Sequence, residues 1–379
     1  MSAATLHHLK IPLRRPFGHV LATRDHAEAL VLVVEADGVT GVGECVPRPY
    51  VTGETFDTAW QMITQLRLDA VLAQVEAGSP AALAHSVEHL ALPGLAARCA
   101  VELAVLDLCC KRAGWSLSAL AFALGLPPAL VSDHPLPEVI SVPLDLHSEP
   151  ADLASRVGPR LGHVKVKVGA DLAADVRRVR ACRERFGAAV TMSVDANMAW
   201  TVEDTLRAAD ALRPFDLAWF EEPLQPALRD RYPELRARGG VAVMLDESAC
   251  SAAQVRDAIA SGACDLVNIR LSKQGGYLPA LRVAELAHRA GVGYQHGAQV
   301  GQLGILNAAG RHFTRVVRGI VACEGGPGLA NLSDHPTRTK VELDWTAGHL
   351  VGLTGPGLGV ELDPAKLRAY AIRSAELAS

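Results

Sequence analysis

Four short apolar strands, each ending in charged residues, follow one another in HVKVKVG (163–169), AVTMSVDAN (189–197), LAWFEEP (217–223) and VAVMLDES (241–248). The same rhythm continues on both sides, in VISVPL (139–144), CDLVNIRLSK (264–273), GVGYQHG (291–297) and RGIVACEG (318–325). Amphipathic segments separate these strands, as at 171–186, 203–212, 252–261 and 279–290. Eight such repeats predict an α/β fold, a (β/α)-barrel of the modified TIM type. An open doubly wound sheet is disfavoured, because no glycine-rich fingerprint follows the first strand.

The N-terminal third has a different pattern. ALVLVVEAD (29–37) is an apolar β-branched run that ends at Asp37-Gly38, a hairpin signal, and VTGVGE (39–44) reads as the returning strand. Residues 55–123 are helical in pattern, with breaks at Pro80 and Pro93-Gly94. Strands followed by helices predict an α+β layer. We therefore expect an α+β capping domain over 1–130, the catalytic barrel over 131–340, and a C-terminal segment over 341–379 that packs back on the cap.

The composition narrows the class of protein. About half of the 379 residues are apolar, which suits one large barrel with a smaller second layer. A net charge of −4 without a basic face argues against a nucleic-acid partner. No apolar stretch reaches the length of a membrane helix or of a signal peptide. The eight cysteines form no CxxC pair, so we expect reduced thiols in a cytoplasmic enzyme.

Acidic residues end three successive strands of the predicted barrel. Asp195, Glu221 and Asp246 are separated by one βα unit each, and catalytic groups of such barrels lie at these strand ends. Three carboxylates without His or Cys form a hard oxygen site, which suits Mg²⁺ and also Mn²⁺. Without a cation the buried anions would repel one another. The sequence therefore predicts a divalent metal site, with Mg²⁺ as the cofactor.

Three lysines accompany these acids. Lys165 and Lys167 are two residues apart on one strand, so they share a face, and Lys273 ends the sixth strand farther around the barrel. Two lysines on opposite sides of a metal-bound substrate carboxylate would face the two sides of the adjacent α-carbon. Lys165 should lower the pKa of Lys167 toward neutrality, as a general base requires. The metal should stabilise the enediolate that forms when the α-proton leaves.

Each of these motifs also has an ordinary explanation. A single lysine at a strand end is usually solvated, EEP often opens a helix, and DES is often an N-cap. Five such signals, however, fall in order on five successive strands. We therefore interpret them as one site.

The motifs resemble those of the enolase superfamily, in its mandelate racemase/muconate lactonizing enzyme family and muconate lactonizing enzyme subgroup. The matching stretches are KVKVG (165–169), DAN (195–197), EEP (221–223), DES (246–248) and NIRLSKQGG (268–276), and GECVPRPYVTGET (43–55) is similar to the second capping loop. Enolase-superfamily sites pair a Lys or His base with Mg²⁺. The resemblance implies metal ligands at Asp195, Glu221 and Asp246. It also implies a base at Lys167 beside Lys165, and an opposite acid/base or cation at Lys273.

The resemblance further implies supporting residues. Asn197 would support the metal site, and Glu247 would be a partner of Lys273. Two capping segments, at about 17–26 and 45–53, would close over the substrate. His19, Arg24 and Tyr50 are then candidate substrate contacts, or simply exposed polar residues of these segments.

Two residues at the remaining strand ends are also candidates for substrate binding. His296 ends the seventh strand, where it is either a contact to substrate or a structural histidine bonded to a loop carbonyl. Glu324 ends the eighth strand in CEGGPG (323–328) and could meet a substrate cation. VTGET (51–55) resembles the capping loop of dipeptide epimerases. Those enzymes carry an Asp-x-Asp on the eighth strand. This chain lacks the Asp-x-Asp there, which argues against a dipeptide substrate.

Proton removal next to a small-molecule carboxylate is therefore the expected reaction, and its product stays open. The two lysines favour a racemase or epimerase of an amino acid derivative. The alternatives are a muconate-type cycloisomerase, or a dehydratase of a hydroxy acid or a hydroxyproline-type substrate. A Schiff-base aldolase and a non-catalytic barrel are less well supported, because the triad and the lysines are all present. By resemblance we also expect a homo-oligomer.

Overall fold

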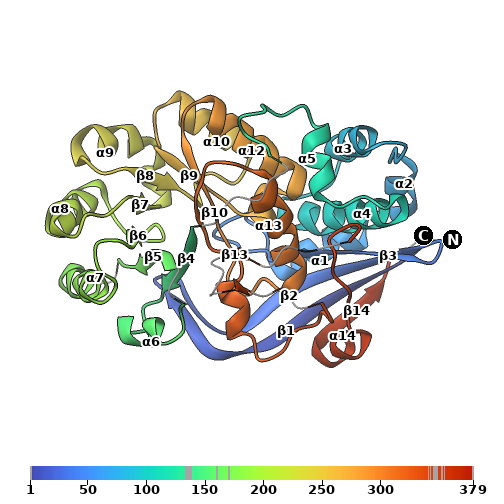
Figure 1. Ribbon diagram of the computed structural model, residues 1–379, viewed down its shortest axis with the longest axis horizontal. Helices are drawn as coiled ribbons and strands as arrows, with labels where there is room; N and C mark the ends of the chain where they lie inside the picture. The colour runs from blue at the N-terminus through green and yellow to red at the C-terminus, as the bar shows by residue number, and fades with distance from the viewer. Residues whose placement is uncertain are drawn as a thin grey trace.

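The computed structural model describes residues 2–132, 139–158, 161–169, 171–339, 341, 343–344, 349–350, 353 and 355–377 of the chain. A closed barrel packs against a four-stranded sheet that is covered by helices (Figure 1). This arrangement confirms the predicted barrel with an α+β cap. The proposed boundary at residue 340 adjoins residues outside the described ranges.

All eight predicted barrel strands are present and pair in parallel around the closed ring. In ring order they are β10 (Gly293–His296), β11 (Ile320–Cys323), β4 (Ile140–Leu144), β5 (Leu161–Lys167), β6 (Thr191–Asp195), β7 (Phe220–Glu221), β8 (Val243–Leu245) and β9 (Leu266–Ile269). Side chains alternate between the two faces of each strand. On β5, Val164 and Val166 face the outer helices and join the apolar core, which turns Lys165 and Lys167 inward.

Helices cover the outside of the barrel, as expected from the amphipathic segments. They are α6 (Pro150–Ala154), α7 (Leu172–Phe186), α8 (Val202–Leu212), α9 (Tyr232–Gly239), α10 (Ala252–Ala260), α12 (Tyr277–Arg289) and α13 (Gly304–Val316). Shorter elements join them: η1 (Arg213–Phe215), η2 (Pro226–Arg231), α11 (Leu271–Gln274), η3 (Pro327–Asn331), β12 (Leu343–Asp344) and β13 (His349–Leu350). No helix of the described residues is both long and apolar enough to cross a membrane.

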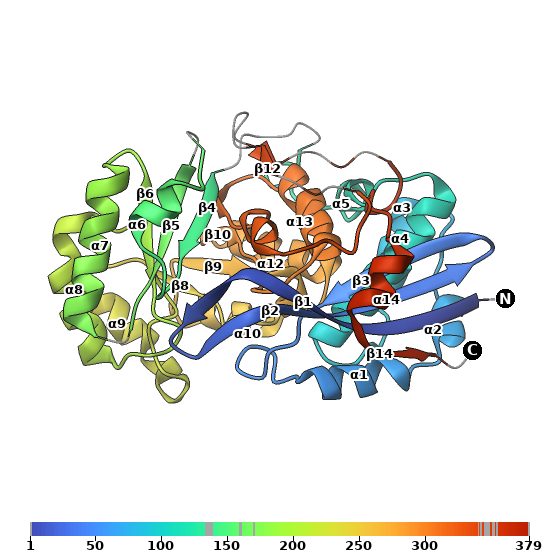
Figure 2. The same cartoon turned by 90° about the horizontal axis from the view of Figure 1, so that it is seen from below.

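The capping layer is an antiparallel sheet with the strand order β14-β1-β2-β3. Its strands are β1 (Ser2–His19), β2 (Ala22–Ala36), β3 (Val39–Cys45) and β14 (Ala371–Glu376), the last one preceded by α14 (Pro364–Tyr370). Asp37 and Gly38 form the predicted turn, with φ angles of 52° and 77°. The C-terminal segment thus completes the sheet next to β1 (Figure 2).

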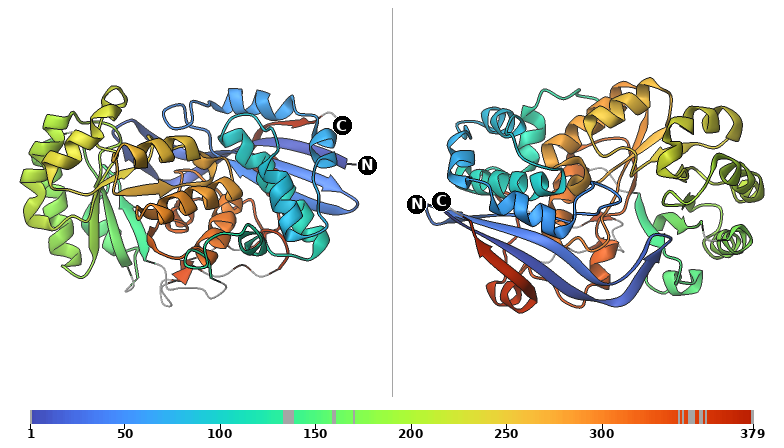
Figure 3. Two further views of the ribbon diagram at one scale, coloured as in Figure 1. Left: turned by 90° about the horizontal axis from the view of Figure 1, so that it is seen from above. Right: turned by 180° about the vertical axis from the view of Figure 1, so that it is seen from behind.

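Five helices complete the cap and lie apart from the green and yellow helices of the barrel (Figure 3). They are α1 (Phe56–Thr64), α2 (Leu68–Ala73), α3 (Pro80–Glu88), α4 (Ala96–Ala113) and α5 (Ser118–Ala123). The longest, α4, lies close against β3. A Cβ on Gly43 would come within 1.9 Å of the carbonyl oxygen of Ala100, so only glycine permits this approach.

Strand β1 was not predicted from the sequence, and the structure of its C-terminal end corrects the expectation of a loop there. β1 and β2 form a long hairpin that reaches from the cap to the barrel (Figure 2). The region 17–26, expected to be a loop, forms the paired tip of this hairpin, with Phe17 opposite Arg24. Pro12 and Pro16 hid the strand in the sequence, because the strand continues through a register shift between residues 12 and 17.

Two buried carboxylates of the cap bind the ends of barrel helices. Glu44 on β3 accepts hydrogen bonds from the backbone N–H groups of Leu303 (2.5 Å) and Leu306 (2.9 Å) at the start of α13. Glu102 on α4 accepts from Tyr277 (2.6 Å) and Leu278 (3.0 Å) at the start of α12. Burial raises the pKa of both carboxyl groups to about 7. The barrel helices thus obtain N-terminal acceptors from another domain.

Candidate active site

The two lysines of β5 reach the same group of carboxylates. Lys167 Nζ donates to Asp195 Oδ2 at 2.5 Å and to Asn197 Oδ1 at 3.0 Å. Lys165 Nζ lies 3.2 Å from Glu221 Oε1 and 3.6 Å from Asp195 Oδ2, and it forms an ion pair with Glu324. Both side chains are buried.

Lys165 is part of an ion-pair cluster and is not an isolated charge beside Lys167. Burial alone would lower the pKa of Lys165, but Glu221, Glu324 and Asp195 raise that pKa above its ordinary value. Lys165 therefore stays protonated at neutral pH. Its charge is balanced by these acids, which the sequence pattern did not indicate.

Lys273 lies on the opposite side of the barrel, in a different element from the one expected. Strand β9 ends at Ile269, and Lys273 belongs to the short helix α11. Its Nζ donates to the carbonyl oxygens of Asn268 (2.6 Å) and Asp246 (2.8 Å) and to Asp246 Oδ1 (2.9 Å). Burial lowers the pKa of Lys273 to about 8. Because β5 and β9 are four strands apart in a ring of eight, Lys167 and Lys273 face each other across the mouth.

The three predicted metal ligands all lie at this mouth and are fully buried. Asp195 stands directly opposite Glu221 in the β6–β7 register, and Asp246 follows β8. Burial would raise the pKa of Asp195, but Lys167 and Lys165 hold it well below its usual range. Burial raises the pKa of Glu221, although Lys165 opposes this shift.

Cations of the chain surround these carboxylates. Arg270 forms an ion pair with Asp246. Within the part of the chain that the structure describes, no three His, Cys, Asp or Glu side chains are gathered as a closed ligand set. The donor chemistry nevertheless fits a hard divalent cation, because three buried carboxylates lie at the ends of successive strands and supply oxygen ligands.

Glu247 does not support Lys273 through a hydrogen bond, although its charge raises the pKa of Lys273 against the effect of burial. Its Oε1 atom accepts a hydrogen bond of 3.2 Å from Asn197 Nδ2, whereas the hydrogen bonds of Lys273 go to Asp246 and Asn268. Asn197 therefore links Glu247 to Lys167. Burial, with Glu222 and Asp195 nearby, raises the pKa of Glu247 to about 8.

Lys165 and Lys167 line a small chamber of about 50 Å³. His19 and Tyr50 line it from the cap, and Glu324 lines it from the end of β11. Tyr50 Oη lies 3.4 Å from His19 Nε2. Burial, followed by the charge of Lys167, lowers the pKa of His19 to about 3, so this imidazole is neutral. These three tentative contacts are therefore placed where a substrate could reach them.

Two other tentative contacts do not line the chamber. Arg24 lies in the hairpin tip opposite Phe17, outside the set of residues that form the wall. His296 follows Gln295, whose amide points inward and lies 3.5 Å from Glu221 Oε2. The alternation of the strand therefore turns His296 outward, where its ring packs 5.5 Å from Phe313 of α13. Burial lowers the pKa of His296 to about 4, in keeping with a neutral structural histidine.

Sequence reasoning missed three polar residues of the mouth: Asn268, Arg270 and Gln295. Asn268 Nδ2 donates to Glu221 Oε1 at 2.8 Å, and Arg270 Nη1 donates to Gln299 Oε1 at 3.1 Å. Asn268 lies in the apolar strand β9, and Arg270 follows two residues later, directly after the end of this strand. That spacing places both on the inner face and could have identified them.

Comparison with known proteins decides the family. The family model "Mandelate racemase / muconate lactonizing enzyme, N-terminal domain" matches residues 1–121, and "Enolase C-terminal domain-like" matches residues 150–366. This chain belongs to the mandelate racemase/muconate lactonizing enzyme family of the enolase superfamily. Its named relatives include racemases, epimerases and cycloisomerases, together with an o-succinylbenzoate synthase, and the chain is an enzyme of this family.

Three relatives from this family illustrate the likeness. An N-succinylamino acid racemase from Amycolatopsis is 32% identical over 97% of this chain and 96% of its own length. An N-succinyl-L-Arg/Lys racemase from Bacillus cereus is 27% identical over 98% of both chains. The solved structure of a dipeptide epimerase from Cytophaga hutchinsonii, complexed with Mg and the dipeptide D-Ala-L-Val, has a TM-score of 0.81 at 25% identity and covers 99% of both chains.

Proposed function

We propose that this enzyme inverts the α-carbon of an N-acylated amino acid, with Lys167 and Lys273 as the two proton carriers. The observation that carries the proposal is the placement of these lysines on opposite sides of the barrel mouth. A carbon held between two such groups can lose its proton to one face and regain a proton from the other.

The surrounding residues give each lysine a defined position. Asp195 and Asn197 hold the ammonium group of Lys167, while Asp246 and the Asn268 carbonyl hold Lys273. A pKa of about 8 lets Lys273 exchange a proton near neutral pH, which is the property that a general acid or base needs.

Asp195, Glu221 and Asp246 are the residues that would hold a divalent cation, for which Mg²⁺ is our first choice and Mn²⁺ the second. When bound, such a cation supplies positive charge that makes the proton next to a substrate carboxylate more acidic. The Mg in the Cytophaga relative supports this choice.

The state of Glu324 favours an acylated substrate nitrogen. Its carboxylate is already paired with Lys165 and accepts from the backbone N–H of Ala298 at 3.2 Å. A free ammonium group would have to compete with Lys165 for this acid, whereas an uncharged amide would not. The names of the Amycolatopsis and Bacillus relatives agree with an N-acyl substrate.

Chiral chromatography tests the proposal. The purified protein with Mg²⁺ is incubated separately with the L and D forms of N-succinyl and N-acetyl amino acids and of a free dipeptide. We expect an N-acyl compound to reach the same mixture from either enantiomer, and the Lys273→Ala variant to leave both unchanged. Full retention of configuration for every N-acyl compound would contradict the proposal.

A further inference from the structure

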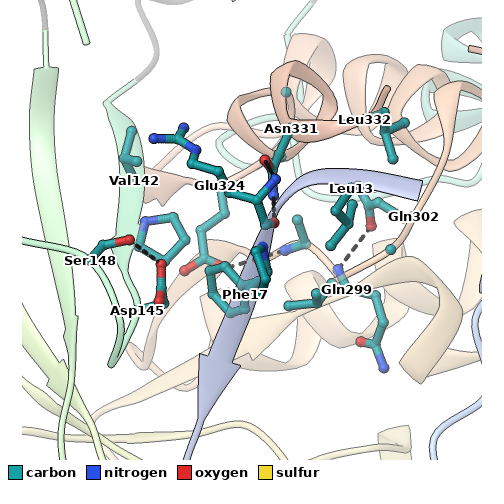
Figure 4. A pocket seen from close by; sticks show the side chains of 18 of the residues that line it. Leu13, Phe17, Val142, Asp145, Ser148, Gln299, Gln302, Glu324, Asn331 and Leu332 are labelled. Carbon is teal, nitrogen blue, oxygen red and sulfur yellow. Dashed lines mark hydrogen bonds between the residues drawn. The ribbon is translucent and has the colours of Figure 1, made fainter. Parts of the chain in front are cut away.

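A second cavity, which we call the outer pocket, continues the chamber away from the lysines. It has a volume of about 120 Å³ and shares Phe17, Pro143, Ala298 and Glu324 with the wall of the chamber. Leu13 and Phe17 of β1, Val142 of β4 and Leu332 give it apolar sides (Figure 4). A substrate whose α-carbon lies between the lysines could therefore extend an aliphatic segment into this pocket.

Two arginines, which we call the guanidinium pair, also line the outer pocket: Arg15 and Arg156. Partial burial lowers the pKa of Arg156, and the nearby charge of Arg15 lowers it further, so the two cations repel each other. Among the described residues no carboxylate forms an ion pair with either one. Asp145 lines the same pocket, and its charge, together with that of Asp152, offsets part of the charge of Arg156 without a direct ion pair.

The oxygens of Asp145 are engaged elsewhere. Oδ1 accepts from the backbone N–H of His147 at 2.8 Å. Oδ2 accepts from Ser148 Oγ at 2.6 Å (Figure 4). Arg156 uses its Nε atom to donate to the Asp152 carbonyl at 3.0 Å. Among the described residues, the side chain of Arg156 makes no other hydrogen bond, so its two terminal nitrogens are available to a ligand.

The backbone at Arg15 is held in place by one side chain. Arg15 N donates to Asn331 Oδ1 at 3.1 Å, and Asn331 Nδ2 donates back to the Arg15 carbonyl at 2.8 Å. The preceding residue points elsewhere, because Arg14 Nε donates to the Leu332 carbonyl at 2.8 Å and Arg14 does not line the pocket. Arg15 is therefore presented to the pocket by a fixed piece of chain.

We propose that Arg15 and Arg156 recognise a carboxylate at the far end of the substrate, separated from the α-carbon by a short aliphatic segment. The inference rests on the proposed function and specifies its substrate class. An anion between two repelling guanidinium groups removes their repulsion and gains charge-assisted hydrogen bonds. The carboxylate belongs either to a dicarboxylic N-acyl group, such as succinyl, or to an acidic side chain.

Calorimetric binding to the Mg²⁺-saturated protein tests this assignment without relying on turnover. One ligand pair is N-succinyl-L-valine and its succinamoyl analogue, in which an amide replaces the terminal carboxylate. The other pair is N-acetyl-L-glutamate and N-acetyl-L-glutamine. We expect the acid of at least one pair to bind roughly tenfold more tightly than its amide, as for one charge-assisted contact at a partly exposed site. The pair that discriminates identifies the source of the carboxylate.

Variants localise the effect. Arg15→Gln and Arg156→Gln should each remove most of the preference for the acid, whereas Arg207→Gln on the surface of α8 should keep it. Equal affinity for acid and amide in both pairs, or a preference that survives in both pocket variants, would overturn the assignment. A preference for the acid without any interconversion of enantiomers would leave the subsite standing and refute the proposed function.

Discussion

The cap–barrel junction and the barrel mouth both bury carboxylates, but the two regions satisfy them differently. At the junction, Glu44 and Glu102 accept hydrogen bonds from backbone N–H groups at helix starts. At the mouth, Asp195, Glu221 and Asp246 face lysine and arginine side chains. Backbone donors cannot move, so the junction has one arrangement. Cations on long side chains can rearrange, as the metal ion and substrate carboxylate that we propose for the mouth would require.

The largest predicted effect is on catalysis. Lys167→Ala should reduce racemisation by at least roughly 10²- to 10⁴-fold, because a general base is lost. Folding should be retained, since the carboxylates at the junction are untouched, and bound metal should also be retained, since Lys167 is not a proposed ligand. Chiral chromatography measures the rate, and circular dichroism and elemental analysis check fold and metal. Normal turnover in this variant would exclude Lys167 as the base.

Removing a proposed metal ligand should abolish metal binding without unfolding the protein. Asp246→Ala deletes a carboxylate at the mouth, so we expect loss of bound Mg²⁺ and Mn²⁺ together with activity. Metal content after dialysis is read by elemental analysis, with Asp265→Ala as a control that removes an acid outside the mouth. Unchanged metal content in Asp246→Ala would show that Asp246 is not a ligand.

A substitution at the cap–barrel junction should lower stability and leave activity nearly unchanged. Glu102→Ala leaves the backbone N–H groups of Tyr277 and Leu278 without their acceptor, which should lower the free energy of unfolding by roughly 2–4 kcal/mol. Racemisation per folded molecule should change little. Urea unfolding measures the difference, with the exposed Glu184→Ala on α7 as a control. A large loss of activity with unchanged stability would contradict a structural role for Glu102 at the junction.

The sequence predicted the barrel and the acidic triad because both depend on periodic patterns. Eight apolar runs separated by amphipathic segments predict the strands, and acids at successive strand ends must lie near one another. The direction of a single side chain, and the element that holds it, were harder to predict from the sequence. Whether His296 points in or out is decided by one step of strand register, and Lys273 lies on α11 although its motif was read as a strand end.

The cap shows a second limit of prediction from the sequence. Asp37-Gly38 predicted one hairpin correctly, but β1 remained hidden because Pro12 and Pro16 interrupt its pattern. Its pairing with β2 and β14 stabilises the strand through contacts that are distant in the sequence. Arg24 was expected in a capping loop that closes over the substrate, and it lies instead in a paired strand. The roles of all the candidate site residues stay predictions.

The smallest predicted effect is a pH dependence of stability. Burial raises the folded-state pKa of Glu102 to about 7, above its ordinary value of 4.5. Between these values the folded state binds a proton that the unfolded state releases, so the free energy of unfolding should fall as pH rises from 4.5 to 7 and then level off. Urea midpoints from pH 5 to 8 should show a flatter decline for Glu102→Gln. An equally steep decline in that variant would assign the effect to other groups.

The most direct test of the two-lysine account is exchange of the substrate α-proton in D₂O. The L and D enantiomers of a substrate are followed separately by proton NMR with the Lys167→Ala and Lys273→Ala variants and Mg²⁺. The account predicts that neither variant interconverts the enantiomers. It also predicts that each variant still exchanges the α-proton of one enantiomer, and that the two variants act on opposite ones. Exchange of the same enantiomer by both variants, or of both enantiomers by either one, would contradict the assignment of one lysine to each face.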